Sequence, residues 1–466
     1  MIEIPRVALR AFRTALRRSF PPRLPTDRQP QVVVDVNDGR LLLQAQHPDG
    51  AIACQLPSSH QTLEMIVLPA AFLLEAEGRV GNATLESTAD KIVARWDEEG
   101  VPRSVEYAAT DGAKLLPFPK LPGTFVTTPP HFIKALDDAV HCAAAESVRY
   151  ATTKVQLRGS GEIVATDSRM LLVQSGFKFP WKDNVLIPRM TLFSANVLPT
   201  VVPLKVGRTG THVVFQAGSW TVALPADTES RFPPYDQVIP KATRTTWAIA
   251  PADADVLIRT LPRLPGDKVS DAPVTVDLNG QVHVRAKAED QTHPTDLKLE
   301  QSKVTGSPVR FAVNRHWLLR ALQLGFREVR IAEPDVPLLC AEPQRKFLFM
   351  PLSKECVLPP SPDAIRITPT AVHSLPPTSL RKRKEKIMAM PQPKPSAPPG
   401  PPRTNPNPPS IMPMMDPVSE AEALQTVLRE ALGRMNHLVL VLKQRRRQHK
   451  LVDSALTSLR QLQPPA

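Results

Sequence analysis

One pattern occurs six times in the first 358 residues of the chain. A short apolar segment ends at a proline or asparagine, and a stretch with large apolar residues three to four apart follows it. The segments are Ile2–Pro5, Ile66–Pro69, Phe125–Pro130, Val185–Pro188, Trp247–Pro251 and Phe311–Asn314. The successive proline or asparagine positions are 64, 61, 58, 63 and 63 residues apart. Such a regular period is typical of a fold built from repeated supersecondary units.

The pattern predicts a strand, a helix and further strands in each unit. Apolar residues three to four apart form one face of a helix, and proline fits its first turn because the missing N–H has no partner there. Alternating strand-like runs lie between these helices, for example at residues 31–36, 210–215 and 274–278. Since two units make a domain of ordinary size, we expect an α+β fold with three domains. Their predicted ranges are residues 1–122, 123–243 and 244–358. The alternative is an ordinary α+β protein with coincidental spacing.

The composition changes sharply after Leu358. The 59 residues from Pro359 to Pro417 contain 18 prolines, which favours an extended, disordered linker over residues 359–415. Residues 416–463 are expected to form an amphipathic, coiled-coil helix, because apolar residues recur there at alternating spacings of four and three around a basic run. We favour self-association or docking on a partner for this helix over packing on its own body, since the linker isolates it.

The net charge of +13 indicates an anionic partner, either nucleic acid or a lipid surface. Residues 1–30 hold 7 Lys and Arg against 2 Asp and Glu, and residues 359–466 hold 16 against 7, so the residues between them are nearly neutral. The Arg-rich, acid-poor N-terminus is also compatible with a transit peptide, although its pattern favours a folded helix. No run approaches the ~18 apolar residues of a spanning helix. We therefore expect a cytoplasmic protein with no membrane role.

No catalytic, cofactor or metal site is expected. The four cysteines form no C-x-x-C pair, and the eleven histidines do not cluster at ligand spacing. Glycine-rich phosphate loops and the common hydrolase motifs are missing from the sequence. Asp137 and Asp138 are adjacent, but neighbouring helix residues point about 100° apart and do not share a site. We predict that the protein is not an enzyme.

Several segments carry a recognisable pattern. They are Val148–Tyr150, Val164–Leu171, Arg231–Tyr235, Val238–Lys241, Phe311–Leu319 and Phe347–Leu352. In this order they resemble the bacterial sliding clamp, the beta subunit of DNA polymerase III. The resemblance covers about residues 1–358, is weakest in the first domain, and suggests a diverged member with a C-terminal extension. It implies a three-domain DNA-clamp fold, with sheets outside and helices inside, in which two head-to-tail subunits close a ring around duplex DNA.

A ring that slides must attract phosphate without reading bases. The first predicted helix fits this requirement, because an arginine stripe lies opposite an apolar stripe. The arginine stripe is Arg6, Arg10, Arg13 and Arg17, and the apolar stripe is Leu9, Phe12, Leu16 and Phe20. A solvated charged face is the alternative, but no acid interrupts the arginines, which favours DNA. The resemblance implies further DNA contacts at Arg23, Arg149 and Tyr150.

The resemblance also implies an apolar pocket between the second and third domains that binds short peptides of polymerases and repair proteins. Matched position by position, it includes Thr166, Leu171, Pro233, Val238, Asn314, Trp317, Leu348, Met350 and Pro351. Core packing is the alternative for each apolar member taken alone. The match of three separate segments favours the pocket.

The sequence departs from the clamp pattern at several places. Ser168-Arg169-Met170 replaces the usual Gly-His-Arg, Thr152 stands at a commonly apolar pocket position, and Trp317 replaces a smaller aromatic residue. Clamps generally end near the Met-Pro-Leu segment, whereas this chain continues for 108 residues past Leu358. These departures leave ligand preference open, and the tail could cover the pocket or recruit a partner to it.

The leading prediction is a DNA sliding clamp, a nucleoid-associated homodimer and processivity factor. Its partners would be double-stranded DNA, DNA polymerase, other clamp-binding proteins and a clamp loader. One alternative keeps the fold and makes the protein a clamp-like paralogue that serves as a DNA-associated scaffold. Another makes it an interaction protein organised by its coiled-coil tail.

Overall fold

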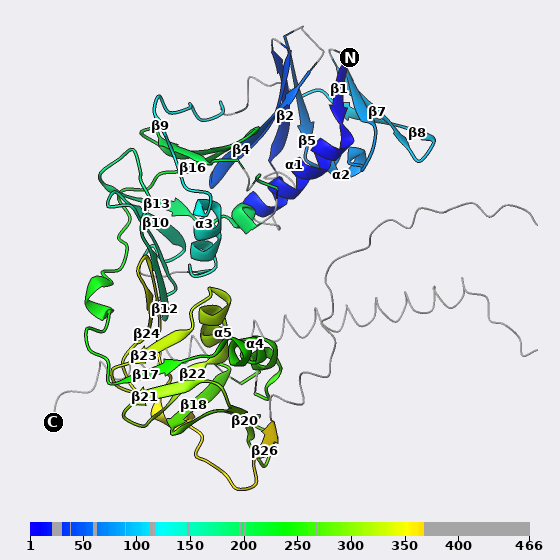
Figure 1. Cartoon of the computed structure of the whole chain (residues 1–466). Helices are drawn as coiled ribbons and strands as arrows, with labels where there is room; N and C mark the ends of the chain where they lie inside the picture. Colours follow the sequence, from blue (N-terminus) through cyan, green and yellow to red (C-terminus); the bar gives the residue numbers. More distant parts are fainter. Residues whose placement is uncertain are drawn as a thin grey trace, which may run out of the picture. The chain divides into compact units, whose positions relative to one another are not determined.

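All six predicted units form a strand followed by a helical segment in the computed structural model (Figure 1). The pairs are β1 (Ile2–Pro5) with α1 (Arg6–Ser19), β5 (Glu64–Pro69) with α2 (Ala71–Ala76), β9 (Phe125–Thr127) with α3 (Phe132–Val140), β13 (Asn184–Pro188) with the 3-10 helix η3 (Thr191–Ser194), β17 (Thr245–Ala248) with α4 (Pro251–Thr260), and β22 (Val309–Asn314) with α5 (Arg315–Gln323). The fourth unit therefore contains only a single 3-10 turn where a helix was expected, although Leu192 and Phe193 are buried as predicted.

The structure describes most of the first 367 residues. The described ranges are 1–20, 30–37, 39–58, 63–88, 90–110, 115, 117–146, 150–194, 197–199, 202–266, 268–269 and 271–367. The predicted terminal helix and most of the predicted linker lie outside them. We refer to residues 1–122, 123–243 and 244–358 as domains one, two and three, the ranges predicted above.

The described strands form four sheets. A four-stranded sheet has the order β1, β6 (Asn82–Ser87), β7 (Lys91–Glu98), β8 (Val101–Ala108). An eight-stranded sheet has the order β5, β2 (Gln31–Asn37), β3 (Arg40–His47), β4 (Gly50–Pro57), β16 (Trp220–Pro225), β15 (His212–Ala217), β14 (Lys205–Arg208), β9. A nine-stranded sheet has the order β13, β10 (Lys154–Arg158), β11 (Glu162–Thr166), β12 (Met170–Gln174), β25 (Arg345–Phe349), β24 (Leu338–Glu342), β23 (Glu328–Ile331), β17, β21 (Lys303–Gly306). A five-stranded sheet has the order β22, β18 (Pro273–Asn279), β19 (Gln281–Ala286), β20 (Thr295–Leu299), β26 (Ile365–Ile367).

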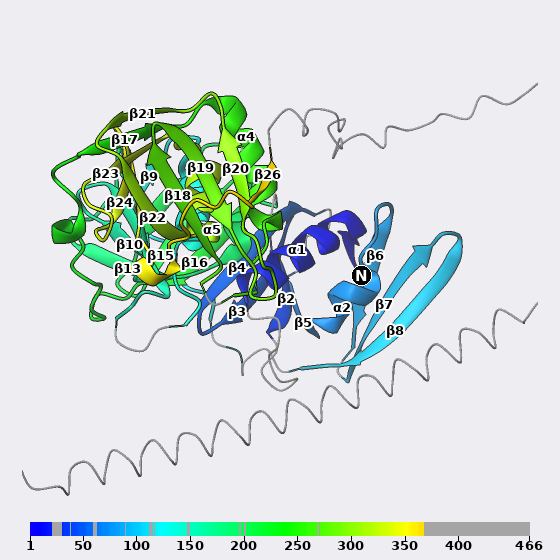
Figure 2. The same ribbon diagram turned by 90° about the horizontal axis from the view of Figure 1, so that it is seen from below.

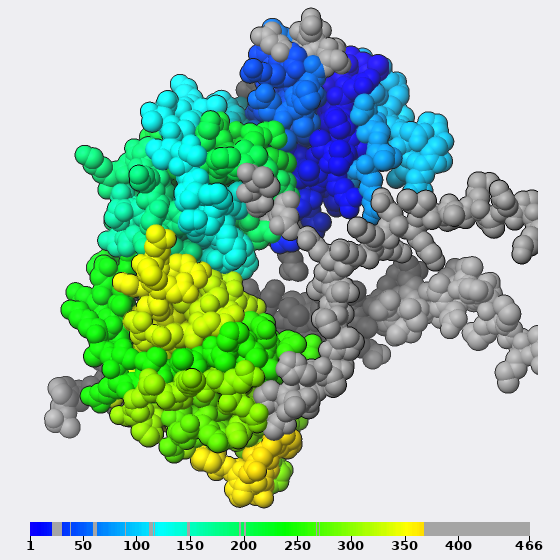
Figure 3. Space-filling model, in the orientation of Figure 1, coloured from blue at the N-terminus to red at the C-terminus, as the bar shows by residue number. Residues whose placement is uncertain are grey.

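Two of these sheets join neighbouring domains edge to edge. β4 of domain one pairs antiparallel with β16 of domain two, and β12 of domain two pairs antiparallel with β25 of domain three. Figure 3 shows the resulting contact, with the yellow surface of domain three directly against domain two. Backbone hydrogen bonding therefore fixes the register across both junctions.

The helices pack in pairs within the domains. α1 contacts α2, α3 contacts η3, and α4 contacts α5. In domain one the pair lies between the two sheets, with β2 and β5 on one side and β7 on the other (Figure 1). Phe12 of α1 stacks on Trp220 of β16, with ring centroids 6.0 Å apart. The apolar faces of the helices thus form the core, which leaves their other faces to solvent.

Three units place an arginine directly after the strand-ending residue, and each of these arginines donates to backbone carbonyls. Arg6 Nε donates to the Ala76 carbonyl at 3.0 Å, and Arg189 Nε donates to the Val140 carbonyl at 2.9 Å. Arg315 Nη2 donates to the Pro265 carbonyl at 2.6 Å. The repeat therefore uses this position to tie one segment of the chain to another.

The chain continues as ordered structure past domain three. Ile365–Ile367 form β26, which pairs in parallel with β20, and Figure 2 shows it beside that strand. This short strand lies within the range that the proline content predicted to be linker. Sequence composition missed it because only three residues take part.

Candidate nucleic-acid interface and peptide pocket

The arrangement of α1 confirms its predicted apolar stripe. Leu9, Phe12, Leu16 and Phe20 are all buried. Arg10 and Arg17 are exposed on the other side of the helix, and neither has an ion-pair partner among the described residues. Two arginines of the predicted stripe are thus placed to meet an anion.

Arg6 does not belong to the DNA-facing stripe. Only 5% of its surface is exposed. Its guanidinium donates to the carbonyls of Ala76, Glu77 and Asp97, at 3.0 Å and 2.9 Å for the first two. Helical spacing placed it with Arg10, but its side chain turns into the connection after α2. The repeat offered a signal that was missed, because the matching positions in two other units also hold arginine.

Arg13 is partly neutralised. Its Nη1 lies 2.7 Å from Oε1 of Glu77, and both side chains are about three-quarters buried. Arg18, which was not predicted, is exposed beside Arg17. The available cations of α1 are therefore Arg10 in its N-terminal half and Arg17 and Arg18 in its last turn.

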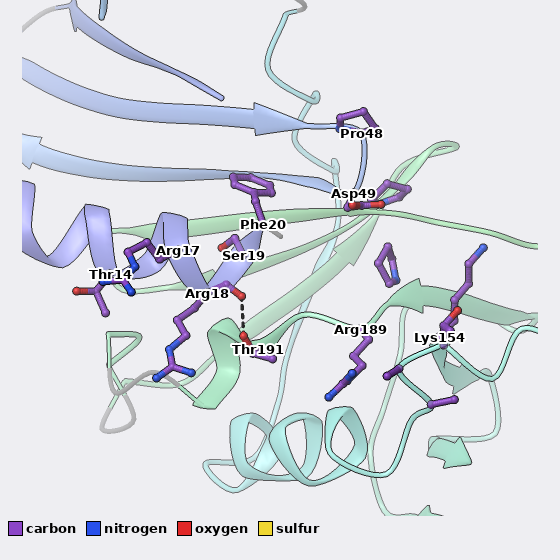
Figure 4. A pocket seen from close by; sticks show the side chains of 15 residues that line it. Thr14, Arg17, Arg18, Ser19, Phe20, Pro48, Asp49, Lys154, Arg189 and Thr191 are labelled. Atoms are coloured by element: carbon purple, nitrogen blue, oxygen red, sulfur yellow. Dashed lines mark hydrogen bonds between the residues drawn. The ribbon is translucent and has the colours of Figure 1, made fainter. Parts of the chain in front are cut away.

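A cavity of about 1060 Å³ lies where the end of α1 meets domain two, and Figure 4 shows its lining. Arg17, Arg18, Lys154 and Arg189 line it, with Asp49 as its acidic member. Lys154 forms an ion pair with Asp227, whose carboxyl pKa is held below its usual range despite partial burial. Arg189 donates a hydrogen bond to the neutral Val140 carbonyl and keeps its charge, so Arg17, Arg18 and Arg189 supply the positive charge of this cavity that no carboxylate pairs with among the described residues.

The remaining predicted DNA contacts are placed differently. Arg23 and Arg149 lie outside the described residues. Tyr150 lines the apolar pocket, and the guanidinium of Arg231 lies 5.8 Å from the centre of its ring. Among the described residues, the structure thus associates Tyr150 with the pocket.

A cavity lies at the junction of domains two and three, where the sequence predicted a peptide pocket. It has a volume of about 240 Å³ and a largely apolar lining. Six of the nine predicted residues line it: Thr166, Leu171, Pro233, Val238, Leu348 and Met350. The pairing of β12 with β25 brings these distant segments together, since Leu171 and Leu348 are directly opposite each other.

The other three predicted pocket residues do not line this cavity. Asn314 caps α5, with its Oδ1 accepting from the His316 N–H at 2.8 Å. Pro351 forms a bridge with Val313. Trp317 is 8% exposed and lies beneath Arg169, whose guanidinium is 6.0 Å from the ring centre. Arg169 itself lines the pocket and thereby separates Trp317 from it.

A strained turn forms one rim of the pocket. Ser168 has φ of +77°, a left-handed conformation that favours glycine. Asp167 Oδ1 accepts from the N–H groups of Arg169 and Met170 at 2.8 and 2.6 Å, and Thr166 Oγ1 accepts from the Ser168 N–H at 3.0 Å. These side-chain bonds explain how serine is held where clamps usually have glycine.

The floor of the pocket includes a buried tyrosine. Burial raises the pKa of Tyr235 to about 12, and Arg158 Nη1 donates to its hydroxyl. Thr152, expected at a pocket position, is buried and does not line the cavity. Residues 352–367 do not line it either. The described part of the tail therefore leaves the pocket open.

Solved structures of bacterial sliding clamps are similar to this chain. A sliding clamp (DNA polymerase III subunit beta) of Pseudomonas aeruginosa bound to griselimycin matches with a TM-score of 0.64 and 15% identity, over 75% of this chain and 98% of that one. The DNA polymerase III beta chain of Streptococcus pneumoniae matches with a TM-score of 0.64 and 16% identity, over 76% and 100%. The DNA polymerase III subunit beta of Borrelia burgdorferi, in complex with a natural product, matches with a TM-score of 0.65 and 11% identity, over 76% and 98%. The α+β DNA-clamp fold predicted from the sequence is thus confirmed.

Other comparisons add nothing to this similarity of fold. No protein-family model matches the chain, and no curated protein matches its sequence. The described helices include none that is long and apolar enough to cross a membrane. Among the same residues, no group of three His, Cys, Asp or Glu side chains is arranged to hold a metal ion.

Proposed function

We propose that the protein is a diverged sliding clamp. Two copies close head to tail into a ring around duplex DNA, placed there by a clamp loader, and the ring tethers DNA polymerase and other clamp-binding proteins at the nucleoid. The observation that carries the proposal is the combination of the clamp fold with the exposed cations Arg10, Arg17 and Arg18 on α1. A nearly neutral body suits sliding, because it makes few phosphate contacts and so does not hold the protein at one place on the DNA. Such a protein needs no chemistry of its own, since tethering raises the effective concentration of the enzyme it holds.

Retention on DNA of different topology tests this proposal. The protein is diluted so that dimers dissociate and is then reconcentrated in the presence of nicked circular plasmid. The mixture is separated by gel filtration on a large-pore column in high salt. We expect it to elute with the circle and to be lost after a single cut linearises the plasmid. Equal retention on circular and linear DNA, or none on either, would contradict encirclement.

The pocket is proposed to bind a short apolar peptide of a partner protein. Replacing Met350 with alanine is expected to weaken binding of a DNA polymerase III clamp-binding peptide about tenfold or more, because the thioether lines the cavity. Fluorescence anisotropy of the labelled peptide measures the change. The matched control is Met65→Ala, since Met65 is exposed on β5 and outside the pocket.

The peptide-binding measurement also distinguishes a sliding clamp from a clamp-like paralogue that serves as a scaffold. The altered Ser168-Arg169-Met170 rim motivates the scaffold alternative, because Arg169 is engaged with Trp317 and with Asp271, 3.6 Å away. A wild-type protein without affinity for any polymerase peptide, together with no effect of Met350→Ala, would favour the scaffold.

A further inference from the structure

The fourth strand of each unit, counted from the strand before the helical segment, follows a pairing rule; in the fifth unit a further strand, β21, comes after it. These strands are β4, β8, β12, β16, β20 and β25, in chain order. β4 pairs antiparallel with β16, and β12 pairs antiparallel with β25. Both domain junctions are therefore made by two fourth strands meeting edge to edge. The rule leaves two fourth strands outside these junctions, β8 in domain one and β20 in domain three.

The two remaining fourth strands, β8 and β20, differ in what covers them. β8 forms the edge of its sheet, with no further strand beside it among the described residues. Most of its residues are exposed. The edge of β20 is occupied by β26, and Thr295, Asp296 and Leu297 lie opposite the three residues of β26. An unpaired edge offers a row of N–H and C=O groups to another strand, so of these two strands it is β8 that presents such a row.

β26 reaches β20 through a strap, which we define as residues 352–367. The Leu352 N–H donates to the Ala312 carbonyl of β22 at 2.7 Å. Farther along, the Leu358 N–H donates to Thr275 Oγ1 of β18 at 2.8 Å. Between these points lies the 3-10 helix η6 (Lys354–Cys356). The strap thus crosses the five-stranded sheet from β22 past β18 before it adds to the far edge.

The strap contacts β20 through a short strand pairing. The Ile365 N–H donates to the Pro294 carbonyl at 2.9 Å, but 57% of the surface of Ile365 is exposed. Ile367 is partly buried against the core. β26 has three residues in a parallel pair, whereas β8 offers eight residues. Antiparallel pairing is also somewhat more stable per residue than parallel pairing, so β26 is suited to be displaced.

We propose that β26 and β8 of a second copy compete for the same edge of β20. By the pairing rule, β8 of one copy adds antiparallel to β20 of the other, and this closes the ring. β26 holds that edge in the open chain and is released when the ring closes, so the strap sets how readily two copies join. This inference rests on the proposed ring.

Proline variants of the full chain test the competition. In Ile365→Pro/Ile367→Pro, proline removes the N–H groups that face β20, because N–H directions alternate along a strand and that of Ile365 points to β20. Arg366→Pro is the matched control, since its N–H points away from β20. Sedimentation velocity over a dilution series gives the dimer dissociation constant of each protein.

We expect Ile365→Pro/Ile367→Pro to lower the dimer dissociation constant tenfold or more, and Arg366→Pro to leave it unchanged. If β8 instead adds outside β26, all of these prolines weaken the dimer, which overturns the competition and keeps the ring. If the wild-type protein dimerises and no variant changes its dissociation constant, the competition is likewise overturned and the ring is kept. A chain that stays monomeric in every variant overturns the proposed ring itself.

Discussion

Replacing Arg315 with methionine is expected to lower the free energy of unfolding by about 3–5 kcal/mol, since it leaves several buried acceptors without a donor. Arg315 has no exposed surface. Its guanidinium donates to five backbone carbonyls, those of Leu261, Leu264, Pro265, Ala272 and Pro273. Four of these carbonyls belong to the connection between α4 and β18, in whose described residues η5 (Leu261–Arg263) is the one short helical segment, and the fifth is that of Pro273, which begins β18. Methionine fills a similar volume but donates nothing.

Urea unfolding of the full chain measures this effect. The control is Arg263→Met, because Arg263 is an exposed arginine of the 3-10 helix η5 (Leu261–Arg263) in the same connection. We expect it to change the free energy of unfolding by less than about 0.5 kcal/mol. Equal effects of the two substitutions would show that the carbonyl cluster does not depend on Arg315.

Removing the charges of Arg10 and Arg17 together is expected to weaken binding to duplex DNA about tenfold or more and to reduce the salt dependence. Both side chains are exposed and without ion-pair partners among the described residues. Each lost phosphate contact reduces the steepness of log affinity against log salt by about 0.9. For Arg10→Gln/Arg17→Gln we therefore expect a slope that is shallower by nearly two. Anisotropy with a labelled duplex at several salt concentrations gives both quantities.

The charge-matched control is Arg95→Gln/Arg244→Gln. Arg95 on β7 and Arg244 just before β17 are exposed and form ion pairs with Glu86 and Glu333. They carry the same charge away from α1, so their loss should leave the slope nearly unchanged. If both double variants reduce affinity equally, net charge and not the face of α1 drives binding.

The sequence predicted those parts of the fold that depend on local pattern. Six strand–helix units were expected from periodicity; five of them contain an α-helix and the fourth a 3-10 turn, and the apolar residues of all six are buried. Six of the nine residues predicted for the pocket also line one cavity, although Leu171 and Leu348 are far apart in the chain. They could be named together because the resemblance to sliding clamps implies a pocket between the second and third domains.

What was missed depends on neighbours that a local pattern does not contain. Arg6 has the helical spacing of a DNA-facing residue, but the carbonyl of Ala76, seventy residues away, binds its side chain. Asn314 matched a pocket position, yet its capping bond to His316 fixes it on α5. β26 was hidden in a proline-rich region, because its partner β20 is an edge that only the folded sheet reveals.

Cross-linking of the ring on DNA tests the central claim most directly. Cysteines replace Ser104 on β8 and Glu300 just after β20, both exposed, while the half-buried Cys356 becomes serine and the other three cysteines stay buried. The protein is reconcentrated on circular plasmid, treated with a bifunctional maleimide and denatured. We predict a covalent two-copy circle that stays on the plasmid through denaturation and leaves after one cut. A cross-linked product that dissociates from the intact circle, or no two-copy product at all, would contradict the account.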